Sequence, residues 1–390
     1  MDAEALEPLI RRFAARNAVL PIGGGLWVPA YHPELRIAPP FSEWEFSGDM
    51  IRMPEFCAPA LGNKNNVVTI DGETARDFDD AVWVDRLADG TYALHVHIAD
   101  VAHFVRPGSA IDVEARLRGT SVYFPDRAVP MLPLELSTDL CSLKPNEDRI
   151  VLSVLLTIDR HGDVVRQEFA RGIIRSVERM TYTAVQQVLD GDTEATARYE
   201  RLAPRFRLME ELARILNKRR ERRGSIDFDL PEPVIDFDEA GEMTAISPAP
   251  RYMAHRIIEE FMLAANEAVA SHLEHLDLPF LYRIHEPPDA DRVMEFEDIA
   301  AGFGYSLGFA ALPVKRFPMV DRKRDGRKIR KDLVLADERL EVTSRHYQRL
   351  AARLEGKPEE RILNYMMLRS LKQARYSAEN TGHFALASHC

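Results

Sequence analysis

The order of secondary-structure signals along this chain predicts an α+β protein, in which strands come first and helices follow. Between residues 67 and 158 the sequence consists mostly of short β-branched and apolar runs separated by turn residues, which is typical of strands. From about Thr181 onward, apolar residues recur at helical spacing instead. We therefore expect a mixed or antiparallel sheet with surrounding helices, preceded by a small N-terminal appendage.

The expected appendage covers residues 1–64. Leucine, isoleucine and phenylalanine between residues 6 and 13 have helical spacing, with acidic residues before them and arginines after them. Three consecutive glycines end this pattern, and Leu26–Val28 then reads as a short strand. A helix with short strands suggests a winged-helix-like unit, and we place the boundary of the main domain at residues 65–390.

Several elements of the main domain can be placed from their patterns. Residues 67–70 and 81–84 are apolar and partly β-branched, so each is expected to form a strand. Residues 91–105 alternate well enough to be a half-buried strand that leaves Asp100 at one end. Long helices are predicted at about 252–276, with Glu259 and Glu260 on or near the polar side, and at about 359–376.

An acidic run between the first two strands is the main candidate for chemistry. It contains four aspartates: Asp71, Asp77, Asp79 and Asp80. Carboxylates this close repel one another unless cations hold them, and hard cations such as Mg²⁺ take oxygen ligands. Two such ions, roughly 4 Å apart, form the usual clamp for phosphodiester cleavage. A solvated turn is the alternative, and composition alone favours it. A helix-loop-helix calcium site fits poorly, because Ala75 and Arg76 fall at positions that need an oxygen ligand and a glycine.

Three histidines follow the acidic run, at His95, His97 and His103. They could suggest a metal site, but no carboxylate trio accompanies them at helical spacing. We interpret them as strand histidines.

The composition is that of an ordinary globular protein, with 46% hydrophobic and 29% charged residues. No run is long enough to span a bilayer, and the acidic N-terminus is unlike a signal peptide. Three scattered cysteines predict neither a disulfide framework nor a zinc site, so a reducing, cytoplasmic location is expected. We expect a monomer.

The net charge of −11 excludes coating of nucleic acid by overall charge, but local basic clusters can still attract it. One cluster lies at residues 218–223, where a solvated helix face is the simpler interpretation. The other, from Lys315 to Lys331, holds nine basic residues and is predicted to be a basic loop facing a polyanion.

Five stretches together resemble the catalytic domain of the ribonuclease II and ribonuclease R family. They are residues 70–81 (containing RDFDDA), 95–105 (HVHIADVAHFV), 118–149, 255–288 and 369–388. They occur in the family's order and cover most of residues 65–388. A single DFDD phrase would be weak evidence, whereas five motifs in order are strong.

This resemblance implies removal of nucleotides from the 3′ end of single-stranded RNA by Mg²⁺-dependent hydrolysis (Mn²⁺ being another candidate ion), with release of nucleoside 5′-monophosphates. Asp71 and Asp80 would hold one Mg²⁺, Asp77 and Asp79 would help complete the centre, and loss of Asp79 would harm the chemical step most. Tyr123 would stack on the base nearest the cleavage point, and Tyr282 or His285 would supply the opposing stack.

The sequence also departs from that family. Members carry paired OB-type barrels before the catalytic domain, and the residues before 65 cannot contain two. The family's serine-proline-isoleucine segment, with its phosphate-clamping arginine, would follow Phe384, but the sequence stops at Cys390. The chain is therefore expected either to be a fragment or to bind RNA and cleave it poorly. A non-catalytic RNA-binding protein on the same scaffold is the alternative function, and a phosphoesterase acting on small molecules is a third.

Overall fold

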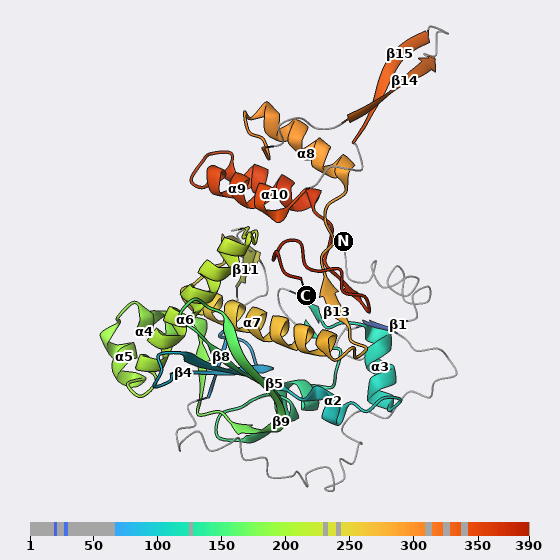
Figure 1. Ribbon diagram of the computed structural model, residues 1–390. Coiled ribbons are helices and arrows are strands. Elements are labelled where there is room, and N and C mark those ends of the chain that lie inside the picture. The colour runs from blue at the N-terminus through green and yellow to red at the C-terminus, as the bar shows by residue number, and fades with distance from the viewer. Residues whose placement is uncertain are drawn as a thin grey trace. The chain divides into compact units, whose positions relative to one another are not determined.

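The fold is described from a computed structural model (Figure 1). It describes residues 19–21, 27–29, 67–124, 128–228, 233–238, 243–308, 314–322, 328–336 and 342–389. Of the predicted appendage, only β1 (Val19–Pro21) and β2 (Trp27–Pro29) fall in this part, and they pair antiparallel. The helix predicted before them lies outside the described residues, so the winged-helix interpretation and the boundary at residue 65 stay predictions.

A six-stranded sheet is the main β structure of the described residues. Its order is β10-β3-β4-β5-β8-β9. The strands are β3 (Val68–Asp71), β4 (Asp80–Arg86), β5 (Tyr92–Ala99), β8 (Asp148–Ile158), β9 (Val164–Arg175) and β10 (Glu178–Thr181). β10 runs parallel to β3, whereas β3 and β4 are antiparallel. The predicted α+β class with a mixed sheet is therefore confirmed.

The chain divides into two compact units. Unit 1 comprises Met1–Val84, Leu94–Leu155 and Glu168–Arg205, and unit 2 comprises Asp85–Ala93, Leu156–Gln167 and Phe206–Cys390. The metal-binding candidates of the acidic run all belong to unit 1.

Unit 1 packs an apolar core beneath the acidic run. Its fully or nearly buried members are Phe78, Ala81, Ala99, Ile111, Leu136, Cys141, Leu143, Val151 and Ile174. The helical elements of unit 1 are α2 (Val101–Phe104), α3 (Ala110–Arg118), a π-helical turn (Leu136–Leu140), α4 (Tyr182–Leu189) and α5 (Thr193–Arg198). A further strand pair is formed by β6 (Val122–Tyr123) and β7 (Ala128–Val129). Phe78 and Ala81 flank Asp79 and Asp80 in the sequence, so burial of these apolar residues anchors the acidic segment to the core.

Unit 2 is mostly helical. Its helices are α6 (Ala203–Arg223, mostly in this unit), α7 (Met253–His275), α8 (Ala290–Gly302), α9 (Ser344–Leu354) and α10 (Glu360–Ser370). α8, α9 and α10 share a core that includes Phe296, Tyr347 and Leu363. Two-stranded sheets are formed by β11 (Pro233–Phe237) with β12 (Met243–Pro248), by β13 (Tyr282–Ile284) with β16 (Arg375–Ser377), and by β14 (Val314–Arg322) with β15 (Lys328–Ala336).

Three local predictions need correction. The strand predicted at 91–105 ends at Ala99, because the Asp100 side chain accepts a hydrogen bond from the His103 backbone and starts a helical turn. The helix predicted at 359–376 ends at Ser370, and its last residues form β16 instead. Glu260 is buried rather than on the polar side, because it pairs with Arg220.

Among the described residues, none of the helices combines the length and apolar character needed to cross a membrane.

Candidate metal centre

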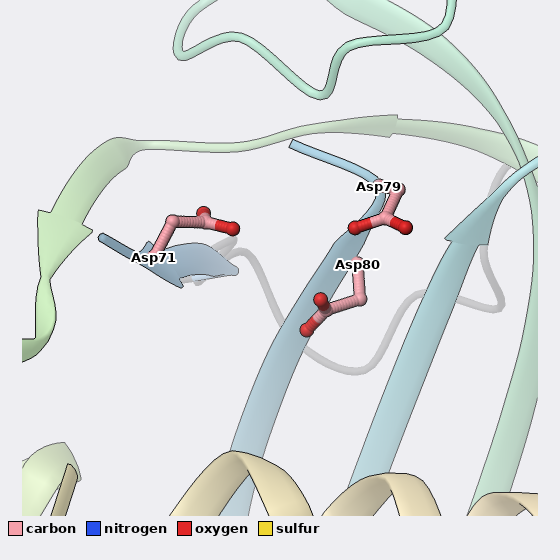
Figure 2. A group of neighbouring side chains, drawn as sticks. All are labelled: Asp71, Asp79 and Asp80. Carbon is pink, nitrogen blue, oxygen red and sulfur yellow. The ribbon is translucent and has the colours of Figure 1, made fainter. Parts of the chain in front are cut away.

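Three aspartates gather where strand β3 ends and strand β4 begins. One carboxylate oxygen from each of Asp71, Asp79 and Asp80 lies within 4.8 Å of the other two. Asp71 is the last residue of β3, Asp80 is the first residue of β4, and Asp79 directly precedes it. Figure 2 shows the side chain of Asp71 extending from its strand towards the two aspartates of the neighbouring strand.

Strand pairing explains this meeting. β3 and β4 are antiparallel with Val68 opposite Val82, and continuing that register puts position 71 opposite position 79. The backbone oxygen of Asp79 also accepts a hydrogen bond of 2.9 Å from the Ala99 amide at the end of β5. β3 therefore ends beside the start of β4, and this brings Asp71 close to Asp79 and Asp80.

The electrostatics of this group are unfavourable without a cation. Burial, followed by the negative charge of Asp79, raises the pKa of Asp71 to about 7. Burial, followed by the charges of Asp79 and Asp71, raises the pKa of Asp80 to about 7. Asp79 is exposed as a residue, yet nearby protein atoms remove enough water from its carboxyl group to raise its pKa as well.

Two of these oxygens are also left without partners. Oδ2 of Asp71 and Oδ2 of Asp80 are buried and accept no hydrogen bond. A buried carboxylate oxygen without a partner is costly, and a hard divalent cation supplies what it lacks. The all-carboxylate donor set therefore fits Mg²⁺ or Mn²⁺, and it favours the metal-site interpretation of the acidic run over the solvated turn.

Asp77, which the resemblance implies helps to complete the centre, lies outside this group of three. It is exposed, but it is close enough that its charge raises the pKa of both Asp71 and Asp79. After burial, the negative charge of Asp77 also raises the pKa of the Tyr123 phenol, which therefore lies near Asp77. Tyr123 is 71% exposed, so the structure places an accessible aromatic ring beside the acidic group.

Arg179 is a contributor that inspection of the sequence missed. It lies on β10, next to β3, and its positive charge lowers the pKa of Asp71 against the effect of burial. Arg76, which is adjacent to Asp77 in the sequence, is exposed. Arg179 is 107 residues from the Gly72 carbonyl that it contacts, so only strand pairing reveals it.

Tyr282 and His285 do not form an exposed stacking surface. Tyr282 is 7% exposed and packs edge to face on Phe280, with ring centroids 5.3 Å apart. His285 is 6% exposed, and its ring lies against His383 and Phe384. A ring covered by core side chains cannot stack on a base, so the predicted opposing stack is not supported for either residue.

A histidine of β5 and the first basic cluster both contact polar or acidic side chains of the protein itself. His95 and His97 lie on β5, and the Nδ1 of His97 is 2.8 Å from the Ser153 hydroxyl. The basic residues at 218–223 lie at the end of α6, where Arg220 pairs with Glu260 at 2.8 Å and Arg223 pairs with Glu267. This cluster is therefore partly neutralised by acids within its own unit.

The second basic cluster is not a loop throughout its length. Residues 314–322 and 328–336 form an antiparallel hairpin whose register runs from Val314 opposite Ala336 to Arg322 opposite Lys328. The prediction of a basic loop is therefore wrong for these two strands.

The fold is α+β with a mixed sheet, and the sheet carries a cluster of carboxylate oxygens that could act as metal ligands. The chain therefore has a candidate divalent-metal centre. The RNB domain family matches residues 62–390. The chain is 43% identical over 319 residues to "Ribonuclease R" of Aquifex aeolicus, covering 82% of this chain and 41% of that relative. The chain belongs to the RNB domain family, and it spans about two fifths of the length of the curated relatives it matches.

Solved structures agree with this assignment. "Mycoplasma genitalium RNase R in complex with ribose methylated single-stranded RNA" has a TM-score of 0.70 and 27% identity, covering 84% of this chain and 46% of that one. "Structure of yeast Ssd1, a pseudonuclease" has a TM-score of 0.60 and 18% identity, covering 83% of this chain and 36% of that one. The second likeness concerns the fold alone.

Proposed function

We propose that this chain is the catalytic part of a divalent-metal-dependent 3′-to-5′ exoribonuclease, which hydrolyses single-stranded RNA to nucleoside 5′-monophosphates. The observation that carries the proposal is the group of Asp71, Asp79 and Asp80, with its crowded charge and two buried oxygens that lack partners. Membership of the RNB domain family supports the same chemistry.

The aspartates would hold Mg²⁺, or Mn²⁺ in its place. Asp71 and Asp80 would bind through their buried oxygens, Asp79 would complete the set, and Asp77 would act from the rim. When bound, the ions supply activation of a water nucleophile and stabilisation of the departing 3′-oxygen. Of the three clustered aspartates, only Asp79 belongs to an exposed residue, so it would be best placed to meet both the ion and the scissile phosphate.

Tyr123 would hold the base beside the acidic group. Its ring is 71% exposed, and its hydroxyl lies close enough to Asp77 for that charge to raise the pKa of the phenol. Stacking on an aromatic ring contributes about 1–3 kcal/mol per base and tolerates any base, which suits a degradative enzyme. An exposed aromatic ring near Asp77, beside the metal site, would align the terminal nucleotide with the reacting centre.

RNA capture would use the basic segment between Lys315 and Lys331. Its nine basic residues give a positive local charge on a chain whose net charge is −11. Binding of that kind weakens as salt concentration rises. We further propose that the protein acts as a monomer in the cytoplasm.

The proposal is tested with single-stranded RNA labelled at its 5′ end and with RNA labelled at its 3′ end. With Mg²⁺, the 3′ label should be released first as nucleoside 5′-monophosphate, while the 5′ label should remain on progressively shorter chains. EDTA should abolish both changes, and Asp79→Asn should lower the rate by at least about 100-fold while leaving RNA affinity within about twofold. RNA binding without metal-dependent release would instead establish the non-catalytic alternative, and equal rates on a dinucleotide and a long RNA would favour a small-molecule phosphoesterase.

A further inference from the structure

The hydroxyl group of Ser142 holds the backbone on both sides of Asp77. Its oxygen accepts a hydrogen bond of 3.1 Å from the Phe78 amide and donates one of 2.8 Å to the Arg76 carbonyl. Ser142 is 1% exposed, and its hydrogen bond with the Phe78 amide is buried. One side chain therefore fixes the direction of the chain just before Asp79 and Asp80.

The neighbours of Ser142 strengthen this attachment. The Leu143 amide donates a hydrogen bond of 2.8 Å to the Phe78 carbonyl, so both backbone groups of Phe78 are bound by consecutive residues. The Ser142 carbonyl in turn accepts a hydrogen bond of 2.8 Å from Nε of Arg149. Ser142 is thus itself held in place, and its hydroxyl group in turn holds the backbone of the acidic segment.

The opposite end of the segment is held by Arg179. Its Nη2 donates to the Gly72 carbonyl at 2.6 Å and to the Glu73 carbonyl at 2.9 Å, directly after Asp71. These hydrogen bonds from Ser142 and Arg179 all go to backbone atoms. None of them involves an aspartate carboxylate oxygen, so these oxygens remain available to bind a cation.

We propose that Ser142 is a positioning residue for the metal centre. It keeps residues 72–79, the aspartate loop, in a cation-binding geometry against the mutual repulsion of the carboxylates. This inference rests on the proposed function, because it concerns the same site. Without the Ser142 hydroxyl, the segment around Asp77 would relax away from Asp71. Loss of a group that hydrogen-bonds a metal ligand lowers metal affinity by about 10- to 100-fold, and because Ser142 binds the backbone next to the ligands we expect the lower end of that range.

A purely structural role is the competing explanation, since a buried serine can simply satisfy nearby backbone groups. Ser176 offers a matched control for it. It is also 1% exposed, and its hydroxyl donates a hydrogen bond of 2.9 Å to the Leu143 carbonyl, outside the aspartate loop. Ser176→Ala removes a buried hydroxyl of the same size without releasing the backbone beside Asp77.

The test compares wild type, Ser142→Ala and Ser176→Ala by calorimetric titration with Mn²⁺ and, in parallel, by RNA hydrolysis over a range of Mg²⁺ concentrations. Ser142→Ala should weaken Mn²⁺ binding by at least about tenfold, whereas Ser176→Ala should stay within about twofold of wild type. In hydrolysis, Ser142→Ala should need more Mg²⁺ for half-maximal rate and should recover most of the wild-type rate at saturation. If Ser142→Ala does not fold, Ser142→Cys preserves the shape of the side chain with weaker hydrogen bonds and should show the same order of effects.

Several outcomes would overturn the proposal. Wild-type Mn²⁺ affinity in a folded Ser142→Ala or Ser142→Cys protein would do so, as would an equal loss in Ser176→Ala. Failure of wild type to bind Mn²⁺ would refute both the metal centre and the role of Ser142. Wild type that binds Mn²⁺ and leaves RNA intact would remove the nuclease proposal alone, and the comparison of metal affinities would still decide the role of Ser142.

Discussion

Replacing Asp80 by asparagine should make the metal-free protein more stable while destroying its metal site. In the folded protein, burial and the charges of Asp79 and Asp71 raise the pKa of Asp80 from 3.8 to about 7. A group whose pKa is raised on folding favours the folded state only while it is protonated. Its contribution is fully present below the unfolded pKa of 3.8 and is lost as the pH rises through about 7.

The size of the effect follows from this shift. Three pKa units at about 1.4 kcal/mol each correspond to a penalty of about 4 kcal/mol above pH 7. An asparagine at position 80 carries no charge, but it leaves a buried amide with unmet hydrogen bonds, at a cost of about 2 kcal/mol. We therefore expect Asp80→Asn to raise the free energy of unfolding by about 2 kcal/mol at pH 8 in EDTA, and the advantage to disappear by about pH 5.

The assay is urea denaturation at pH 5 and pH 8, in EDTA and in excess Mg²⁺. Asp298→Asn, in an exposed position of α8, is the control and should change stability by less than about 0.5 kcal/mol. Mg²⁺ should stabilise wild type but not Asp80→Asn, because only the folded wild type binds the ion. An Asp80→Asn protein that is less stable than wild type at pH 8 in EDTA would refute the reasoning that unpaired charge strains this site.

Three other predictions concern separate features. Tyr123→Ala should weaken RNA binding by about 1–3 kcal/mol in fluorescence anisotropy, whereas Tyr123→Phe should keep most of the affinity; equal losses would exclude stacking. Burial lowers the pKa of His95 to about 4 from an ordinary 6.5, so the unfolded chain takes up its proton first and stability should fall as the pH drops from about 6.5 towards 4. His95→Phe, which keeps a ring against Trp83, should reduce that fall by up to about 3 kcal/mol in acid denaturation, and an unchanged pH profile would contradict the burial argument. Changing four of the basic residues between Lys315 and Lys331 to glutamine should reduce the slope of log affinity against log salt by about three, and an unchanged slope would place RNA capture elsewhere.

The sequence alone was sufficient for the features that depend on local pattern. β-branched runs on either side of the acidic segment predicted β3 and β4, and apolar spacing predicted α7 almost to its ends. The crowding of four aspartates in so short a segment made it the main candidate for a metal site, because repulsion between neighbouring carboxylates follows from sequence alone, although composition by itself favoured a solvated turn. The family motifs predicted the same site from their order along the chain.

What only the tertiary structure decided is which distant residues meet. Antiparallel pairing selects Asp71, Asp79 and Asp80 and leaves Asp77 at the rim, because register determines which carboxylates share one space. Burial excludes Tyr282 and His285 from base stacking, and no local pattern distinguishes a covered aromatic ring from an open one. Arg179 and Ser142 reach the acidic segment from far along the chain, since hydrogen bonds across a fold depend on packing rather than on sequence spacing.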